Sequence, residues 1–269
     1  MAPDSRPNEM RAARSAAITD PAPDPVGPRI LASGDTALVV EFGTTIDRRL
    51  SALVLALDRR LADEHLPGVI ETVPTMRSLM VHYDPVITSH ATLAATIREI
   101  CARLDPAVET TEASGRRFRL PACYEPDLAP DLADVAAATG LSTDRVIALH
   151  ASVAHRVYMI GFVPGQPYMG DLPEALRLPR RTTPRTAVPA GSVAIATGLS
   201  AIYPIESPGG WHLIARTPAR LFDLNRAIPV LLQPGDEVAF APIDRAEFDR
   251  LAAAAAAGSW SAEPIARAS

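Results

Sequence analysis

The second half of the chain consists of short apolar runs separated by glycine and proline turns, and this pattern limits the fold more than any other feature. The runs lie at residues 157–163, 188–196, 212–216 and 236–240. They are shorter than ordinary helices, and the turns between them reverse the chain every few residues. Such a pattern is typical of a β-barrel or a β-sandwich. We therefore expect one of these two architectures in the second half.

The first half has a different pattern, in which helical and strand periodicities alternate. Residues 46–64 and 89–104 carry apolar side chains on one face of an expected helix. Runs that favour strands lie at residues 30–33, 36–42, 69–73 and 78–83. The order ββαββα predicts a small two-layer α/β domain. Together with the β-rich second half, it places the chain in the α+β class.

Composition marks the limits of the domains. The N-terminal residues are rich in Pro, Asp, Arg and Ala, which predicts a disordered tail. A polar, turn-rich segment follows the second expected helix and predicts a linker. We divide the chain into a disordered tail (1–27), an N-terminal α+β domain (28–105), a linker (106–116), a β-barrel domain with a terminal helix (117–257) and a loose tail (258–269).

Three helices and a first strand are expected within the second domain. The strand covers residues 117–123. One helix covers 132–139 and ends at Gly140, and the next covers 144–152 with Ser142 as its cap. The third is the alanine-rich helix at 244–257.

Composition also excludes several kinds of chemistry. All 26 basic residues are arginine, so no lysine is available for a Walker-A loop, a Schiff base or a biotin carrier. The net charge of −5 gives no general affinity for nucleic acid or anionic membrane. No apolar stretch is long enough to cross a bilayer, and no secretory signal is present. Two cysteines are too few for a disulfide scaffold, so we expect a cytoplasmic protein with reduced thiols.

Residues 161–218 form the richest candidate region for binding. Four arginines fall within one short segment that two prolines stiffen, at positions 177, 180, 181 and 185. Guanidinium groups bind carboxylates and phosphates through paired hydrogen bonds. The cluster favours an anion or partner site. The alternative is a solvated face on which these arginines pair with surface carboxylates.

Glycines and aromatic residues in the same region offer further candidates. The pair Gly209–Gly210 follows Ser207, and it either leaves backbone amides open to a ligand or forms a hairpin turn. Trp211 comes next and either stacks on a ligand or, as we favour, packs in the core. Tyr168 and Tyr203 are candidate hydroxyl donors, with a half-buried position as the alternative.

The histidines give weaker indications. His150 ends an expected helix and His155 begins a strand, and their spacing does not fit metal ligands on a helix. Structural roles are favoured for both, with His150 as a general base the alternative. The chain has neither a GxSxG nor a GxGxxG motif, so a serine nucleophile and a dinucleotide fold have no support. No metal site is expected.

Several segments resemble one protein family in their order and spacing. They are GDTALVVEFG at 34–43, VPTMRSLMVHYDP at 73–85, and a later series with GFVPGQPY, PRRTTPRTAVPAGSV, YPIESPGGWHLIARTP and LFD. The chain resembles the carboxyltransferase-domain family that is variously called the B subunit of 5-oxoprolinase, allophanate hydrolase subunit 1 or sensor-kinase inhibitor. The resemblance covers residues 30–243 and implies a small α+β domain followed by a cyclophilin-like β-barrel. The barrel shape does not imply prolyl isomerase activity.

The resemblance also implies an activity and partners. It implies a subunit of an ATP-dependent 5-oxoprolinase, a hydrolase that opens 5-oxo-L-proline to L-glutamate. The partners would be a homologous subunit 2, similar to the C subunit of 5-oxoprolinase, and a third subunit. ATP with Mg would be bound by the assembled complex, and the chain alone would be inactive. Two alternatives remain: a carboxyl-transfer or allophanate and urea-amide hydrolase subunit, and an inhibitor that binds a sensor histidine kinase.

The family's barrel loops, matched to this sequence, imply a set of site residues. We expect catalytic roles for His150, Arg181 and Arg185. Substrate or nucleotide binding is expected of Arg180, Ser192, Tyr203, Ser207, Gly209, Gly210, Trp211 and Arg216.

Three departures from the family's pattern bear on the substrate. The family usually has an aromatic residue where Gln166 stands in this chain, and it usually has a tyrosine near the position of His155. Leu199 lies in GLSAIYP, where many members have GxQTGIYP. These departures leave open whether the substrate is 5-oxoproline, another lactam, a urea derivative or another amide.

Overall fold

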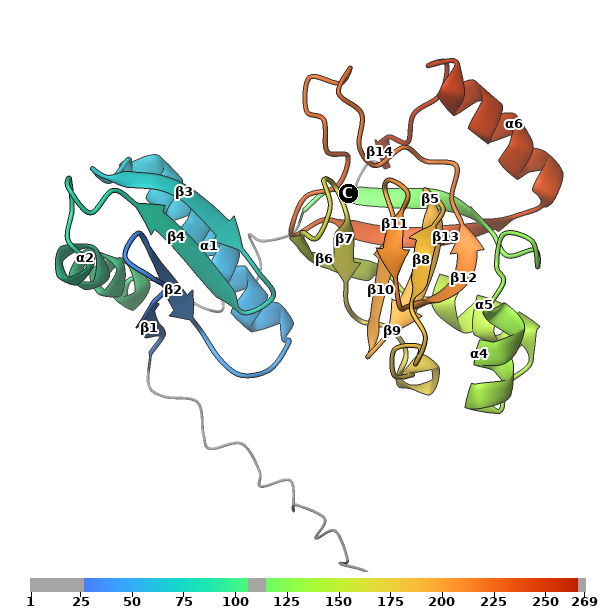
Figure 1. Ribbon diagram of the computed structural model, residues 1–269, viewed down its shortest axis with the longest axis horizontal. Coiled ribbons are helices and arrows are strands. Elements are labelled where there is room, and N and C mark those ends of the chain that lie inside the picture. Colours follow the sequence, from blue (N-terminus) through green and yellow to red (C-terminus); the bar gives the residue numbers. More distant parts are fainter. Residues whose placement is uncertain (1–26, 106–114, 266–269) are drawn as a thin grey trace, which may run out of the picture.

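The structure is a computed structural model that describes residues 27–105 and 115–265. Figure 1 shows a small N-terminal sheet with its own helices beside a larger β-rich part that also carries helices. Residues 1–26 of the expected N-terminal tail and residues 106–114 of the expected linker lie outside the described part of the chain.

The N-terminal domain is an antiparallel sheet with two helices packed on one face. Its strand order is β1-β2-β4-β3. The elements are β1 (Arg29–Ala32), β2 (Ala37–Glu41), α1 (Arg48–Glu64), β3 (Val69–Pro74), β4 (Ser78–Tyr83) and α2 (His90–Ala102). Alternate residues of β2 and β4 point into the same core as the apolar stripes of the helices, because side chains alternate along a strand. This core includes Leu38, Val40, Leu79, Val81, Leu57 and Ile97.

Both helices of this domain begin at a capping side chain. Asp47 accepts hydrogen bonds from the backbone N–H groups of Arg49 and Leu50, and Ser89 accepts one from Thr92. These bonds satisfy N–H groups that have no partner inside the helix. The two-layer arrangement that the ββαββα pattern predicted is therefore confirmed.

The second domain is a closed barrel. Its strands in the described part of the chain follow the order β12-β9-β10-β7-β6-β13-β5, and pairing between β12 and β5 closes the ring. These strands are β5 (Arg117–Cys123), β6 (His155–Ile160), β7 (Pro167–Met169), β9 (Ser192–Ala196), β10 (Leu199–Ile202), β12 (His212–Arg216) and β13 (Glu237–Ile243). All neighbours are antiparallel except β5 and β13, which run parallel. An α+β chain with a barrel was expected and is confirmed.

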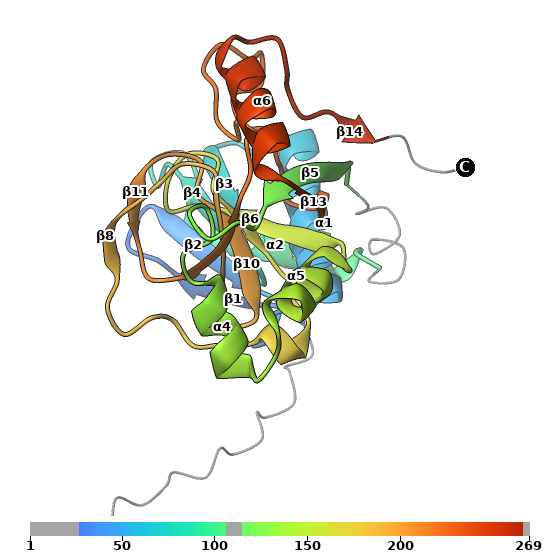
Figure 2. The ribbon, with the colours of Figure 1, turned by 90° about the vertical axis from the view of Figure 1, so that its right-hand side faces the viewer.

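Helices and a small two-stranded sheet cover the barrel. Figure 2 shows α6 (Arg245–Ala256) on one side, and α4 (Leu132–Thr139) and α5 (Thr143–Ala151) on the other. The small sheet pairs β8 (Arg185–Val188) with β11 (Ser207–Gly209), which β9 and β10 separate along the chain. It packs on the outer face of β9 and β10, with Val188, Ala194, Ala201 and Trp211 in one apolar cluster. A single-turn 3₁₀ helix, η1 (Glu174–Leu176), precedes the arginine segment.

Charged and apolar contacts join the two domains. Arg48, at the start of α1, forms ion pairs with Asp171 at 2.6 Å and with Glu237 at 3.2 Å. Met76, in the turn between β3 and β4, packs against the apolar cluster under the β8–β11 sheet. The N-terminal domain therefore reaches the same barrel face that holds Trp211.

The described part of the C-terminal tail packs on the barrel. Pro264–Ile265 form β14, which pairs with Phe118 and Arg117 of β5. Trp260 packs against the barrel core. Residues 258–265 therefore differ from the loose tail that we expected, because an edge strand and an apolar side chain hold them. None of the helices in the described ranges has both the length and the apolar character needed to cross a membrane.

Two glycines give a matched pair of mutations. Gly191 and Gly140 both have positive φ, at 81° and 70°. A Cβ at Gly191 would lie 2.4 Å from the backbone oxygen of Thr217, whereas a Cβ at Gly140 would have no neighbour within 4 Å. We expect Gly191→Ala to lower the free energy of unfolding by roughly 3 kcal/mol, and Gly140→Ala by about 1 kcal/mol. Urea denaturation of both variants measures the difference, and equal losses would contradict the predicted steric clash.

Candidate functional site

The buried carboxylate of Asp131 holds the arginine segment, residues 177–185, against the barrel. Asp131 is only 2% exposed. Its Oδ1 accepts hydrogen bonds from Nη1 of Arg181 at 2.8 Å and from Nη2 of Arg185 at 2.6 Å. Its Oδ2 accepts from Nη1 of Arg185 at 2.9 Å and from the backbone N–H of Leu213 at 2.7 Å. Four donors therefore surround this carboxylate.

These contacts keep Asp131 ionised. Burial by itself raises the pKa of Asp131, but hydrogen bonds from Arg185 and from the Leu213 N–H, with the charges of both arginines, lower it below the usual 3.8. A carboxylate with a lowered pKa stabilises the fold fully above its unfolded-state pKa. This stabilisation is lost as the pH falls through the folded-state pKa. At neutral pH the ion triad is therefore intact.

Arg181 and Arg185 act mainly as supports of the segment. Their side chains are 27% and 26% exposed, and both charges are offset by Asp131. The backbone N–H of Arg181 also donates to the oxygen of Gly210 at 2.8 Å. The two arginines expected to be catalytic thus hold the segment against β12 and the glycine pair. This geometry favours a positioning role for them.

Arg180 is placed differently, with its charge over an aromatic ring. Its guanidinium carbon lies 5.9 Å from the centre of the Trp211 ring. Tyr168 meets the same ring edge-on, at 5.8 Å between centres and an angle of 75°. Trp211 is 6% exposed whereas Arg180 is exposed, and no carboxylate in the described ranges forms an ion pair with Arg180. An exposed cation beside an aromatic surface suits a small ligand with a negative group.

The side chain of Tyr203 leaves no room for a Cβ at position 209 in β11, which explains the glycine there. A Cβ at Gly209 would lie 2.3 Å from the Tyr203 hydroxyl oxygen. Gly209 pairs with Arg185 in the β8–β11 sheet, and Ser207 pairs with Val188. The next strand, β12, pairs with β9 and β5 instead, so the glycine pair joins strands of two sheets and does not form the hairpin turn that was the alternative. The Ser207 hydroxyl is buried and has no hydrogen-bond partner among the described residues.

His150 lies inside the barrel core, apart from the arginines. It is 0% exposed. Its Nδ1 lies 2.9 Å from the Tyr124 hydroxyl and its Nε2 3.3 Å from the Ser200 hydroxyl. Its ring stacks on Phe240 with centres 4.6 Å apart, and Nε2 of His155 bonds to its backbone oxygen at 3.0 Å. The packing supports a structural role for His150 more than that of a general base.

The buried histidines predict an acid-sensitive fold. Burial, and then the charge of His155, hold the pKa of His150 well below 6.5, so the folded chain keeps this imidazole neutral. Below pH 6.5 the unfolded chain binds a proton that the folded chain does not, so stability falls as the pH is lowered. We expect His150 to account for about 1.4 kcal/mol of stability lost between pH 7.5 and pH 5.5.

Urea denaturation at the two pH values measures this loss. His150→Phe removes the titrating group and keeps an aromatic ring against Phe240. The variant should lose about 1.4 kcal/mol less than the wild type over the same pH interval. An unchanged pH dependence in the variant would show that His150 does not titrate in this way.

The remaining expected site residues lie on the barrel itself. Ser192, on β9, is 2% exposed, and its backbone oxygen accepts from the N–H of Tyr203 at 2.9 Å. Arg216 ends β12, and its Nε donates to the oxygen of Ala190 at 2.8 Å. The structure therefore brings Arg180, Arg181, Arg185, Tyr203, Ser207, Gly209, Gly210 and Trp211 together around the β8–β11 sheet. It places His150 in the core and Ser192 and Arg216 at the closure of the barrel.

Two of the departures from the family pattern lie beside the aromatic surface. Gln166 is 3% exposed, its side-chain amide hydrogen-bonds to Tyr168, and its Oε1 has no partner among the described residues. Leu199 packs in the cluster with Trp211. The third departure, His155, lies in the barrel core next to His150, with ring centres 4.8 Å apart.

Sequence reasoning did not identify Asp131, Met76 or Ser200. The sequence marks Asp131 only as the residue before an expected helix, and its arginine partners lie about fifty positions away along the chain. As N-cap of α4 it makes no side-chain capping bond, because the carboxylate is turned to the arginines. Met76 and Ser200 also act through partners distant in sequence.

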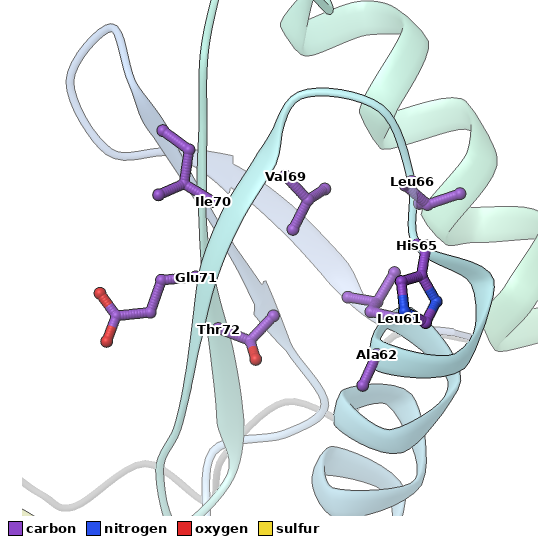
Figure 3. A pocket seen from close by; sticks show the side chains of 8 residues that line it. All are labelled: Leu61, Ala62, His65, Leu66, Val69, Ile70, Glu71 and Thr72. Atoms are coloured by element: carbon purple, nitrogen blue, oxygen red, sulfur yellow. The ribbon is translucent and has the colours of Figure 1, made fainter.

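A separate hollow lies in the N-terminal domain. It has a volume of about 350 Å³ and is lined by Leu61, Ala62, His65, Leu66, Val69, Ile70, Glu71 and Thr72. Figure 3 shows Leu61 and Ala62 on the helix opposite Val69 on the strand, whereas Ile70 and Glu71 point to the other side. The hollow contains none of the expected site residues. Within the described ranges, no group of three or more His, Cys, Asp or Glu side chains is arranged to hold a metal ion.

Comparison with known sequences gives one family. The carboxyltransferase domain, subdomain C and D, matches residues 28–232. The chain is 36% identical to the 5-oxoprolinase B subunit of Bacillus subtilis (strain 168) over 222 residues, which is 80% of this chain and 92% of that protein. It is 41% identical to the 5-oxoprolinase B subunit of Escherichia coli O157:H7 over 209 residues, which is 78% of this chain and 93% of that protein.

Solved structures give the same picture of the fold. The crystal structure of the protein TTHA0988 matches with a TM-score of 0.68 and 34% identity over 77% of this chain. This chain spans only 40% of the length of TTHA0988. The crystal structure of the Kluyveromyces lactis urea carboxylase matches with a TM-score of 0.70 at 20% identity, over 88% of this chain and 23% of that chain. This second likeness concerns the fold alone.

Proposed function

Because this chain belongs to the family of the 5-oxoprolinase B subunit, with its carboxyltransferase domain, subdomain C and D, we propose that it is a subunit of an ATP-dependent 5-oxoprolinase. In this reaction 5-oxo-L-proline is opened to L-glutamate. One observation supports this proposal above the others: 36% to 41% identity continues over 92% to 93% of the length of two proteins that bear the name of that subunit.

The proposal includes partner chains. The two relatives are themselves named as one subunit of an enzyme, and the matched domain is named as two subdomains of a larger whole. We propose a homologous subunit 2, similar to the C subunit of 5-oxoprolinase, and a third subunit as these partners, with the chain inactive alone. We also propose a cytoplasmic location, which the free thiols of Cys101 and Cys123 support.

ATP and Mg²⁺ belong to the assembled complex in this proposal. The chain has no lysine for a phosphate loop, and no described acidic or histidine cluster fits a metal. A lactam amide is a poor electrophile, and ATP supplies the activation of its oxygen. The residues of this chain would bind and orient the substrate.

The surface at Arg180 and Trp211 is the proposed binding surface for that substrate. Arg180 would hold the carboxylate of 5-oxoproline, because its charge is exposed and it lies over Trp211 at 5.9 Å. The small ring would lie beside Trp211 and Tyr168. Arg181 and Arg185 would keep the segment in place through Asp131.

A carboxyl-transfer or urea-amide role is the second candidate. The name of the matched domain and the fold likeness to a urea carboxylase favour it. Urea and 5-oxo-L-proline differ in a way that this surface can discriminate, because urea has no carboxylate for Arg180. The substrate that stimulates ATP hydrolysis therefore separates the two candidates.

Reconstitution by omission tests the proposal. This chain would be co-expressed with the subunit 2 homologue and the third subunit, purified as one complex, and assayed for glutamate formed from 5-oxo-L-proline with ATP. We expect glutamate from the full set and none when this chain is left out. Equal glutamate formation without this chain would reject its role as a required subunit.

A further inference from the structure

A hollow of about 210 Å³ lies between the closure of the barrel and helix α6. Three sequence motifs that are far apart in the chain meet at its rim. Ala190 and Gly191 come from VPAGSV, Pro204 follows Tyr203, and Arg216 begins the run RTP. The meeting of these motifs at one hollow sets it apart from the hollow in the N-terminal domain, which contains none of the expected site residues.

Arg216 brings a positive charge to this hollow without a matching carboxylate. Its residue is partly buried, and its Nε donates a hydrogen bond to the oxygen of Ala190 at 2.8 Å. No carboxylate in the described ranges forms an ion pair with it. Burial, and then the charge of Arg245, lower the pKa of Arg216. A guanidinium that is partly removed from water and has no carboxylate partner gains electrostatic stabilisation when it pairs with an anion.

The other cations nearby are more exposed or already paired. Arg220 also lines the hollow, and its ion pair with Asp223 is long, at 3.8 Å. Arg245 is held by ion pairs with Asp127 and Asp249. Arg216 is therefore the arginine at this hollow whose positive charge is least offset by carboxylates.

The backbone around Arg216 is fixed by hydrogen bonds. The N–H of Gly191 donates to the oxygen of Tyr203 at 2.7 Å, and the N–H of Thr217 donates to the oxygen of Gly191 at 2.9 Å. Gly191 approaches Thr217 so closely that no side chain fits between them. A rigid rim presents the guanidinium group in one place, which lowers the cost of binding.

The opposite wall is apolar and small. It consists of residues on one side of α6, namely Phe248, Ala252, Ala255 and Ala256. A ligand there needs a short apolar body next to its charged group, and the volume admits only a small molecule. A long polyanion would have no second cationic wall to contact.

We propose that this hollow binds a small oxyanion, either a carboxylate or a phosphate, which pairs with Arg216 while any apolar part of the ligand packs against α6. The geometry of the hollow alone supports the binding of an oxyanion. Its identity as a product, namely L-glutamate or inorganic phosphate, rests on the proposed function, in which 5-oxo-L-proline itself is bound at Arg180.

Equilibrium binding to the full-length chain, alone and in the assembled complex, tests the inference. Inorganic phosphate and L-glutamate would each be titrated by calorimetry at constant ionic strength, and circular dichroism would confirm the fold of each variant. Arg216→Gln removes the charge and keeps a side chain of similar reach. Ala256→Phe narrows the hollow from its exposed rim and leaves Arg216 unchanged. Arg250→Gln, on the same helix but paired with Glu247, is the matched control.

We expect at least one of the two anions to bind, and the one that binds identifies the source of the oxyanion. Arg216→Gln should weaken this binding by at least about tenfold, as expected for loss of a charge-assisted hydrogen bond. Ala256→Phe should weaken it as well, and Arg250→Gln should leave it unchanged. If Arg216→Gln does not fold, Ala256→Phe decides the outcome.

The inference is overturned if neither anion binds to the folded wild type, alone or in the assembled complex. It is also overturned if the folded hollow variants bind as tightly as the wild type. The two experiments distinguish a failure of this inference from a failure of the proposed function. Arg216-dependent binding in a complex that forms no glutamate would reject the function and keep the site, whereas glutamate formation without such binding would do the reverse.

Discussion

Asp131→Ala should lower the free energy of unfolding by about 4 kcal/mol, since it leaves two partly buried arginines without their counter-charge. It also leaves the N–H of Leu213 without the acceptor that it now has at 2.7 Å. The loss concerns a carboxylate that is 2% exposed, so water does not replace its contacts in the folded chain. Urea denaturation at pH 7 measures the change.

Two further variants show how much of the effect of Asp131 comes from its negative charge. Asp131→Asn keeps an oxygen for Leu213 but removes the charge, so it should also destabilise the chain, although less than alanine does. Asp134→Asn, at an exposed position in the first turn of α4, should have little effect. A loss below about 1 kcal/mol for Asp131→Ala, as surface ion pairs give, would show that the triad does not hold the segment.

Trp211→Ala should also lower the free energy of unfolding by about 4 kcal/mol, because truncation of a large aromatic side chain loses both transfer free energy and packing. Trp211 is 6% exposed and lies between the β8–β11 sheet and the outer face of the barrel. Its removal also takes away the ring beneath Arg180 and beside Tyr168. Denaturation and the KM for 5-oxo-L-proline in the assembled enzyme are the two measurements.

The other tryptophan provides the control. Trp260 is only partly buried against the barrel core, so Trp260→Ala should cost less and leave the KM unchanged. Trp211→Phe keeps a ring at the site and should keep most of the stability. A KM that is the same in folded Trp211→Ala as in the wild type would remove Trp211 from the proposed binding surface.

Most of the secondary structure could be predicted from the sequence because its causes are local. The strand at Arg117–Cys123 and the helix at Leu132–Thr139 lie where the patterns placed them. Gly140 ends that helix with φ of 70°, and Ser142 caps the next one. Each of these features depends on residues within a few positions of each other.

The arrangement of the site depends on contacts that no local pattern shows. The arginines of the 177–185 segment looked alike in sequence, yet Arg181 and Arg185 are bound to Asp131 while Arg180 lies over Trp211. The closure of the barrel through β12 and β5 decides which side chains point inward. His150 instead packs in the core with Tyr124, Ser200 and Phe240, apart from the loops with which the family motifs had grouped it.

The product ratio of the assembled complex decides whether this chain serves a 5-oxoprolinase. Glutamate and inorganic phosphate would be measured together after adding ATP with either 5-oxo-L-proline or urea. We predict glutamate and phosphate in equal amounts from 5-oxo-L-proline, and neither product above background with urea. A stable complex that hydrolyses ATP with urea and forms no glutamate from 5-oxo-L-proline would contradict the proposed function and favour the urea-amide alternative.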